Sequence, residues 1–555
     1  MAPSTLTVTG DGSGAAATLV SGPTASGSTN LAAGASVTFT WTYNNSGTAA
    51  GNVTFDGTVS ATDANTNAAV GPFTASSGTV GVNVVSTKTA SLSLNSGKVT
   101  LVASDPFGDG TAAATLVGYQ GSAWAGPSQD GSKFARLDPS GSSAPAVAAV
   151  AIGVDAGLSA ASNAAWRASP PATTFGSANC APGTVACGPD DESGAALVLD
   201  GTMGGVEQMF VGGAGAAGPR YLYSTSAGSS PLAFGWADLG SALPTGVEIP
   251  GSFLSAGLVV PAGPGRVYLG YAAPGLGAAL IALVTAPSAS GVDAVAGTDV
   301  VDLAFAAMPG ASGASAVTSL SEVGGVLYVA HDAGLAWAVT AVPGPASTSP
   351  GDWALSTPVV AAWSAKTSLS SASAGSAPAS RAVPSLASFG ACGGSPCVYA
   401  IRNVLGTATE PAAVPQLWRC SPSAGPSQCN PSDWALAAAN TSGDTLLSQL
   451  GDETNGAATL LVATPNWLYL GFDNGSTGIQ VYRASVAPQG VGDFVGENGC
   501  VAGTAGCQGL GGNGFGNPKV TRIFDARAIT VGGTTGLWIA AGDGSGPVSV
   551  YRIAE

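Results

Sequence analysis

A hairpin pattern stands out most clearly in the stretch Asn466-Trp-Leu-Tyr-Leu-Gly-Phe-Asp-Asn-Gly-Ser-Thr-Gly-Ile-Gln-Val-Tyr-Arg483. Apolar residues alternate with others on both sides of the turn residues Asp473-Asn474-Gly475. Period-two alternation interrupted by a Gly/Asn-rich turn is typical of two antiparallel strands. The stretch therefore predicts a β-hairpin, and the same pattern can be followed along the chain.

The first strand of this hairpin occurs six times with an aromatic residue at its centre. Those residues are separated by 58, 60, 71, 70 and 69 positions, and they are Phe210, Tyr268, Tyr328, Tyr399, Tyr469 and Trp538. A weaker copy is Leu116-Val-Gly-Tyr119. A repeat of a few strands cannot bury both of its faces alone, so packing between neighbouring repeats must supply the core. This pattern predicts a β-propeller of about seven blades.

The last copy of the repeat ends at Glu555 without the further strand that follows most other copies. A sheet with an open edge tends to pair with another strand. Two stretches before the first copy, Lys88–Leu94 and Lys98–Val102, have the alternation needed to supply that strand. We therefore expect the two ends of the propeller to pair and close the ring.

Residues 1–90 follow a different pattern, in which apolar residues alternate with hydroxylated ones, as in Ser36-Val-Thr-Phe-Thr-Trp-Thr-Tyr43. Short strands of this kind predict a β-sandwich ahead of the propeller, which would span residues 91–555. Through Leu31–Tyr43 and Ala61–Val70 the segment resembles the immunoglobulin-like repeats of bacterial surface and secreted proteins. In such repeats a further strand comes first, so the resemblance implies that the sandwich is truncated before Met1.

The composition agrees with an all-β protein and argues against two classes of partner. The chain has 555 residues, 82 Gly and 36 Pro, and only 9% charged residues. Its net charge is −16 with 16 basic residues, too few for a patch that neutralises phosphates, so we expect no nucleic acid partner. No apolar run approaches the roughly 20 residues that cross a bilayer, so we expect no membrane insertion.

The eight cysteines form four close pairs, which are Cys180/Cys187, Cys392/Cys397, Cys420/Cys429 and Cys500/Cys507. None has the Cys-x2-Cys or similar spacing of a zinc site, so local disulfides are our interpretation. Disulfides predict an oxidising environment, outside the cell or on its surface. The N-terminus has neither the charged nor the apolar region of a secretion signal.

The segment Gln416-Leu-Trp-Arg-Cys-Ser-Pro-Ser-Ala-Gly-Pro-Ser-Gln-Cys-Asn-Pro-Ser-Asp-Trp434 resembles the Asp-box hairpin of sialidase-like and related bacterial propellers. There an Arg-Ser-x-Asp-x-Gly turn precedes a Trp. Here the Asp is missing, and Cys420 and Cys429 flank the turn. With the other copies, the chain resembles uncharacterised secreted propeller proteins of bacteria. Such a resemblance implies the fold much more than the function.

Residues in turns are the main candidates for a binding site. Asp130, Asp473 and Asn474 lie in predicted turns, where carboxylates can act in glycoside hydrolysis or bind calcium. Asp and Asn also favour turns in any β-protein. Neither Asp lies in the Asp-x-Asp-x-Asp-Gly spacing of a calcium loop, so we expect no cofactor and keep calcium as an alternative.

Three other residues are candidates with a structural alternative. Tyr119 and Trp124 could stack on sugar rings if they face the central channel, but aromatic residues also pack between blades. His331 is the only histidine, which excludes sites that need two, and it occupies a strand end that other copies fill with an aromatic residue.

We expect an extracellular surface or matrix protein whose propeller face is a non-catalytic binding or adhesion module for a glycan or protein ligand, and we do not expect an enzyme. No catalytic residue is assigned. The alternatives are a secreted carbohydrate-active enzyme, glycosidase or lyase, that acts in the propeller channel, and a structural coat component. Inward-facing carboxylates with an Arg or Tyr would favour the enzyme. A channel lined by Ala, Gly and Ser would favour binding or structure.

Overall fold

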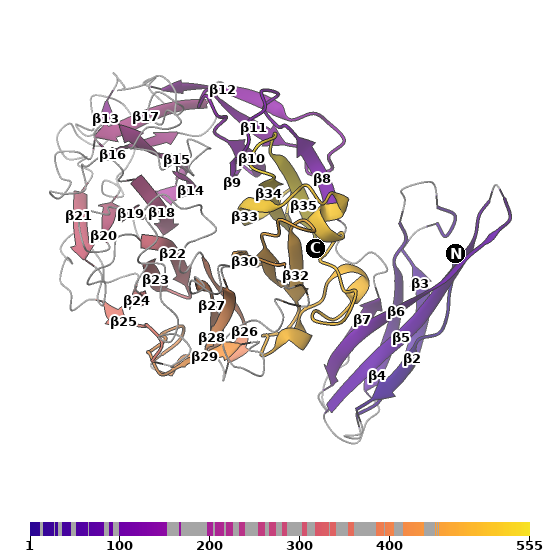
Figure 1. Cartoon of the computed structure of the whole chain (residues 1–555). Helices are drawn as coiled ribbons and strands as arrows, with labels where there is room; N and C mark the ends of the chain where they lie inside the picture. Colours follow the sequence, from indigo (N-terminus) through magenta and orange to yellow (C-terminus); the bar gives the residue numbers. More distant parts are fainter. Residues whose placement is uncertain are drawn as a thin grey trace.

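The computed structural model of the chain is an all-β protein in which small sheets form a ring, with two further sheets beside it (Figure 1). This confirms the all-β class and the propeller. The structure describes residues 1–11, 15–26, 28–31, 36–45, 51–64, 66–82, 88–92, 99–152, 166–167, 197–203, 206–215, 218–225, 232–238, 253–260, 266–272, 280–285, 302–307, 317–331, 334–339, 353–359, 385–392, 395–404, 414–423, 425–437, 450, 452 and 454–555.

The described residues form seven blades, numbered here from the N-terminal side of the ring. Blade 1 consists of β9 (Thr115–Tyr119), β10 (Ser122–Gly126), β11 (Lys133–Leu137) and β12 (Ala146–Ile152), and blade 2 of β14 (Leu197–Met203), β15 (Val206–Gly215), β16 (Gly218–Thr225) and β17 (Leu232–Asp238). Blade 3 consists of β18 (Phe253–Val260), β19 (Arg266–Ala272), β20 (Leu280–Thr285) and β21 (Asp302–Ala307). Blade 4 consists of β22 (Val317–Val323), β23 (Val326–His331), β24 (Gly334–Val339) and β25 (Ala354–Leu355).

Blade 5 consists of β26 (Ser385–Cys392), β27 (Ser395–Val404), β28 (Val414–Cys420) and β29 (Trp434–Ala437), and blade 6 of β30 (Ala458–Ala463), β31 (Leu468–Phe472) and β32 (Gln480–Ala484). Blade 7 consists of β33 (Arg522–Val531), β34 (Thr534–Gly542), β35 (Ser549–Ala554) and β8 (Val99–Ser104).

The first strands of successive blades touch, and β33 of blade 7 touches β9 of blade 1. We call these seven first strands the inner strands. Blades 1 and 2 are also joined at their outer edges, where β12 pairs in parallel with β17, and β13 (Trp166–Arg167) pairs with β17.

The ring closes by pairing of the two ends of the propeller. Strand β8 runs antiparallel to β35, with Thr100 opposite Arg552 and Val99 opposite Ile553. The expected closure is therefore confirmed, and it uses the second of the two stretches. The first stretch contains β7 (Lys88–Leu92), which pairs instead with β4 (Phe39–Asn45).

The repeated two-strand pattern corresponds to the second and third strands of each blade. Tyr469 lies opposite Arg483, and Trp538 lies opposite Arg552. The weak early copy was misaligned by one strand, because residues 116–119 belong to the inner strand β9. The equivalent aromatic residue of blade 1 is Trp124 in β10, which lies opposite Arg136. Alternation alone fits either strand, and only the pairing distinguishes them.

The hydroxyl groups of two of the repeated tyrosines join neighbouring blades. Tyr328 of blade 4 donates to the carbonyl of Ser427 at 2.6 Å and accepts from the amide N–H of Cys429 at 3.0 Å, both in blade 5. Tyr399 of blade 5 donates to the carbonyl of Pro488, after the last strand of blade 6, at 3.1 Å. Both tyrosines are fully buried. In blades 4 and 5 the tyrosine ring therefore fills the core while its hydroxyl satisfies a backbone group of the next blade.

Replacing Tyr328 by Phe leaves a carbonyl and an N–H of blade 5 buried without this partner, so we expect a loss of about 2–3 kcal/mol in the free energy of unfolding. The matched change Tyr399→Phe removes one hydrogen bond and should cost about 1 kcal/mol. Denaturant unfolding of both variants measures the difference, and equal losses would contradict this role of the Tyr328 hydroxyl.

Three disulfides are present, between Cys392 and Cys397, Cys420 and Cys429, and Cys500 and Cys507. They confirm three of the four expected pairs, and Cys180/Cys187 lies outside the described residues. The Cys500–Cys507 bridge belongs to a segment with three short 3₁₀ helices, η5 (Val491–Asp493), η6 (Glu497–Gly499) and η7 (Asn513–Gly516). Through Val495 this segment pairs with Arg483 of β32, so it covers the outer edge of the three-stranded blade 6.

The fourth pair can be tested by thiol alkylation and intact mass. We expect unfolded, unreduced protein to take up no label, and fully reduced protein to take up one label on each of its eight cysteines. Uptake of two labels before reduction would show that Cys180 and Cys187 are free.

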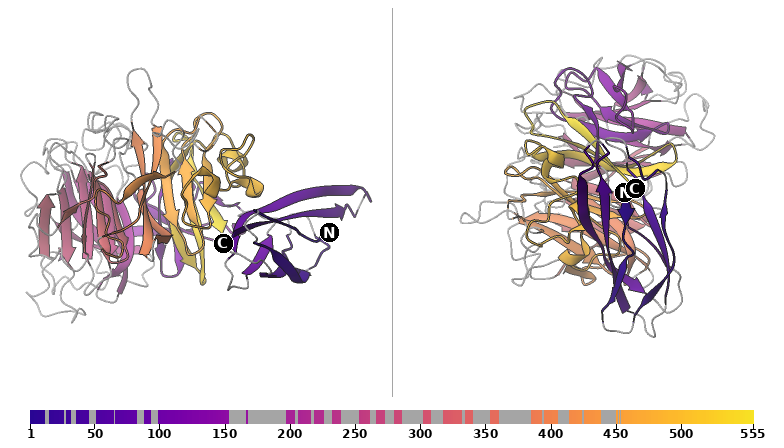
Figure 2. Two further views of the ribbon diagram at one scale, coloured as in Figure 1. Left: turned by 90° about the horizontal axis from the view of Figure 1, so that it is seen from below. Right: turned by 90° about the vertical axis from the view of Figure 1, so that its right-hand side faces the viewer.

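The N-terminal part consists of two sheets that share a core. One contains β1 (Ala2–Pro3), β5 (Gly51–Thr62), β2 (Thr7–Gly10) and β6 (Ala69–Val82), and the other contains β3 (Ala17–Ala25), β4 and β7. The rings of Tyr43 in β4 and Phe55 in β5 pack between them, with centroids 4.7 Å apart, and Trp41 belongs to the same core. Figure 2 shows these sheets projecting beside the C-terminal end of the ring. The immunoglobulin-like assignment and the boundary at residue 90 stay predictions.

Candidate functional site

Charged side chains are rare on the inner strands. Within the ranges given above, these seven strands carry two basic and three acidic residues, namely Arg522, Arg527, Asp200, Glu322 and Asp525. Three of the five form one cluster. We call Asp200, Asp525 and Arg527 the seam cluster, because it lies where blade 7 meets blade 1.

The seam cluster is organised by the guanidinium group of Arg527. Its Nε donates to Oδ2 of Asp525 at 3.1 Å, its Nη1 to Oδ1 of Asp200 at 3.4 Å, and its Nη2 to the carbonyl of Val198 at 2.9 Å. Asp200 and Val198 belong to β14 in blade 2, whereas Arg527 belongs to β33 in blade 7. Since β9 of blade 1 touches both strands, the arginine reaches past β9 on its inner side.

Both carboxylates of the seam cluster also bind the free edge of β9. The N–H of Leu116 donates to Oδ2 of Asp525 at 2.7 Å, and the N–H of Gly118 donates to Asp200. β9 has a paired strand, β10, on only one side, so its inner N–H groups would otherwise lack a protein partner. Side chains from two other blades thus replace a missing strand.

The environment raises the pKa of Asp200 above its usual value. Burial is the main cause, and the nearby carboxylates of Glu207 and Asp525 add to it, whereas Arg527 and the Gly118 N–H act in the opposite direction. Solvent still reaches the cluster, because the side chains of Asp200, Arg527 and Asp525 are 33%, 27% and 21% exposed. Asp200 therefore keeps its proton to a higher pH than an ordinary aspartate does, at a position that solvent reaches.

Asp525 differs from Asp200 in its hydrogen bonds. It accepts from Leu116, from the N–H of Ala526 at 2.9 Å and from Arg527. Its carboxyl oxygens therefore face donors from β9 and β33. A carboxyl group with a raised pKa beside another that accepts several hydrogen bonds is an arrangement that suits general acid and base catalysis.

Tyr119, Trp124 and His331 are buried, with exposed fractions of 1%, 9% and 0%. The indole N–H of Trp124 donates to the carbonyl of Tyr119 at 3.1 Å, and both rings pack with Phe134 between blades 1 and 2. His331 ends β23, as expected for a residue at the end of a blade strand. These positions agree with the structural alternative for each residue, and a role in ligand binding stays a prediction.

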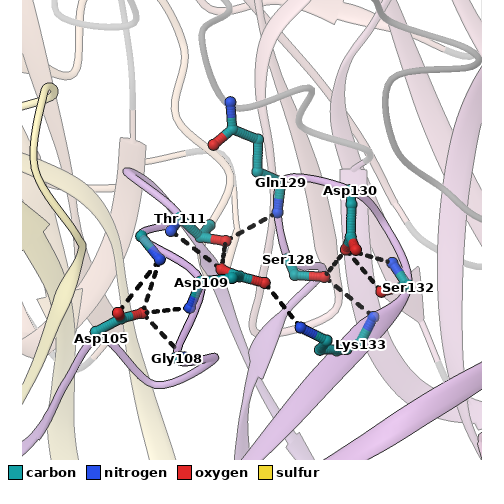
Figure 3. A network of polar contacts seen from close by, with 10 residues as sticks. Asp105, Gly108, Asp109, Thr111, Ser128, Gln129, Asp130, Ser132 and Lys133 are labelled. Atoms are coloured by element: carbon teal, nitrogen blue, oxygen red, sulfur yellow. Dashed lines mark hydrogen bonds and ion pairs between the residues drawn. The ribbon is translucent and has the colours of Figure 1, made fainter.

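Asp130 lies in the turn between β10 and β11, within the polar network of Figure 3. Its Oδ1 accepts from the hydroxyl groups of Ser128 and Ser132, at 2.6 and 2.7 Å. In the same network Lys133 forms an ion pair with Asp109 at 3.1 Å. The carboxylates here hold two loops together, which is the turn role that the sequence left open for Asp130.

Asp473 and Asn474 directly follow β31 and make two different sets of contacts. Oδ1 of Asp473 accepts from the N–H of Ile523 at 2.9 Å and from the hydroxyl of Thr459 at 3.0 Å, and so joins blade 6 to blade 7. Asn474 is buried, and its side-chain amide donates to Asn455 and Thr454. Neither residue contacts the seam cluster in these hydrogen bonds, and their predicted ligand role is untested.

Burial raises the pKa of Asp473 from its usual 3.8 to about 7. The unfolded chain therefore releases this proton at lower pH than the folded chain, and stability should fall by about 2–4 kcal/mol as the pH rises from 4 to 7. Asp473→Asn keeps an oxygen for both donors and should remove this part of the pH dependence. Denaturant unfolding at several pH values measures it.

The matched control is Asp543→Asn. Oδ1 of Asp543 accepts from the N–H groups of Ser545 and Gly546 in an exposed turn, and these hydrogen bonds lower its pKa. Its contribution to stability is lost only at more acidic pH, so the slope between pH 4 and 7 should be unchanged. A wild-type slope in Asp473→Asn would show that Asp473 is already ionised at pH 4.

In the part of the chain that the structure describes, no group of three or more His, Cys, Asp or Glu side chains is arranged to hold a metal ion. Over the same residues, the structure contains no helix long and apolar enough to cross a membrane.

The seam cluster was not among the residues that the sequence analysis selected. The predicted site residues are mainly aromatic residues and turn residues, whereas Asp200, Asp525 and Arg527 lie in strands made mostly of small and aliphatic residues. A usable signal was present, since a charged residue within such a strand is unusual in a chain with 9% charged residues. A charged residue in an apolar strand identifies each position separately, but it does not predict that the three side chains contact one another.

Comparisons with known proteins concern the fold. No family model matches the chain, and no curated protein does. Similar solved structures are an α-L-arabinanase of Penicillium chrysogenum (11% identity, 65% of this chain and 93% of that chain, TM-score 0.31), the polysaccharide lyase Uly1 (9%, 79% and 89%, 0.36) and a sialidase of Trypanosoma rangeli (7%, 64% and 54%, 0.31). The chain thus spans about half the length of the sialidase.

These neighbours are carbohydrate-active enzymes. They contradict the prediction of a non-catalytic binding module and the expectation that the chain is not an enzyme. The seam cluster combines two carboxylates and an arginine on the inner strands, and a cluster of this composition was expected to favour an enzyme. At such low identities and TM-scores the likeness shows the fold alone, so the chemistry must be argued from the residues of this chain.

Proposed function

We propose that this chain is a secreted carbohydrate-active enzyme that cleaves glycosidic bonds at the seam cluster. The observation that carries the proposal is the carboxyl pair, in which Asp200 has a raised pKa and Asp525 accepts three hydrogen bonds. Bond cleavage of this kind uses one carboxyl group that protonates the leaving oxygen and one that acts as base or nucleophile. Asp200 fits the first role and Asp525 the second.

Arg527 would act as a positioning residue for this pair. It contacts both carboxylates and the backbone of blade 2, so the two groups keep a fixed relation although they come from different blades. A site that is fixed before the substrate binds needs little reorganisation during the reaction. The three disulfides support secretion, because such bonds persist in oxidising compartments.

The test is a panel of polysaccharides assayed for new reducing ends with the full chain and with Asp200→Asn. We expect activity in the wild type and a loss of roughly 100- to 10,000-fold in kcat/KM in the variant. Glu322→Gln, which changes the remaining acidic residue of the inner strands, should retain activity.

A purely structural clamp would behave differently. In that case Asp200→Asn would lower the unfolding temperature, and any activity would fall only in proportion to the unfolded fraction. Thermal unfolding measured on the same samples separates the two outcomes. Activity that survives in folded Asp200→Asn would contradict the proposal.

A further inference from the structure

The charges around the seam cluster set a limit on the substrate. Glu207 in β15 lies close enough to Asp200 to raise its pKa, and its Oε1 accepts from the N–H of Gln120 at 3.0 Å. The neighbourhood therefore contains three acidic side chains, Asp200, Asp525 and Glu207, against one basic side chain, Arg527.

The positive charge of Arg527 is already committed to the protein. Each of its three nitrogens donates to an acceptor, namely Asp525, Asp200 and the carbonyl of Val198. Arg522 is the other basic residue of the inner strands, and it begins β33, where its charge acts on Asp473. Among the described inner-strand residues, Arg527 is the only cation that forms an ion pair with Asp200 or Asp525.

A bound uronate or sialate would thus bring a negative charge to a site with an excess of negative charge. Like charges at contact distance repel strongly where water is partly excluded. Cleavage of a uronate by elimination would be disfavoured as well. It removes the proton next to the sugar carboxylate, and that step needs a positive group or a proton to neutralise the carboxylate, whereas the proton of Asp200 is assigned here to the leaving oxygen.

We infer that the seam cluster acts on glycans of uncharged sugars, and that it cleaves them by hydrolysis. Asp200 would give its proton to the leaving oxygen, and the water that adds to the sugar carbon would lose a proton to a carboxylate, so that the bond breaks with net addition of water. This inference rests on the proposed function and narrows it to one substrate class and one reaction.

The experiment compares uronate polysaccharides with their carboxyl-reduced forms, in which the same linkages join uncharged sugars, alongside natural neutral polysaccharides. The full chain is assayed for reducing ends and for the ultraviolet absorbance of unsaturated elimination products. We expect neutral members to be hydrolysed with kcat/KM on the order of tenfold or more above their charged partners, without unsaturated product.

Two variants connect the preference to the site. Glu207→Gln removes one negative charge and should lower the neutral-to-charged ratio several-fold, whereas Glu322→Gln, whose native Oε1 accepts from Gly325 in blade 4, should leave it unchanged. Higher ionic strength should lower the wild-type ratio, because salt screens charges that solvent can reach.

The outcomes separate the two proposals. Equal or faster cleavage of charged members, lost in Asp200→Asn, would overturn the inference and keep the proposed function. Unsaturated product lost in the same variant would overturn hydrolysis. Absence of any cleavage across the panel would overturn the proposed function itself. A ratio unaffected by Glu207→Gln would show that charge at this site does not set the preference.

Discussion

The ring depends on one pairing between segments near the two ends of the propeller, β8 and β35. Without it blade 7 would have a free outer edge. The entropy cost of closing a loop grows only slowly with its length, so a very long connection is not prohibitive. Contacts between blades must nevertheless hold the ring closed. One of them comes from the first strand of blade 7, where Arg527 donates to Asp200 and Val198 of blade 2. Closure of the ring and assembly of the seam cluster are therefore parts of one event.

A second constraint comes from the inner strands themselves. Each has a partner strand on one side only, so its backbone groups on the other side need water or side chains. On β9 this need is met by Asp200 and Asp525. The same hydrogen bonds that satisfy the backbone also fix the directions of the two carboxylates. This explains how two blades can hold an acidic pair in place through the backbone of a third.

The wrong prediction of a non-catalytic module has an identifiable cause. The candidates came from histidine, known motifs and turns, and the acidic residues in turns were selected for ligand binding, with turn formation as the alternative. The carboxylate of Asp130 holds neighbouring serines, as that alternative expects. The acidic residues that matter for the proposed reaction lie within strands. They were passed over because the repeat was recognised by its aromatic residues, which occupy the second strand of each blade.

Much of the architecture was decided by the sequence itself. Alternation and the spacing of Tyr328, Tyr399 and Tyr469 are local patterns, and they determine the strands and the repeat; the cysteine pairs are local as well. The seam cluster depends on tertiary structure, because Asp200 and Arg527 belong to blades that are not neighbours. Their contact exists only once the ring has brought blade 7 next to blade 1, and no spacing along the chain encodes that arrangement.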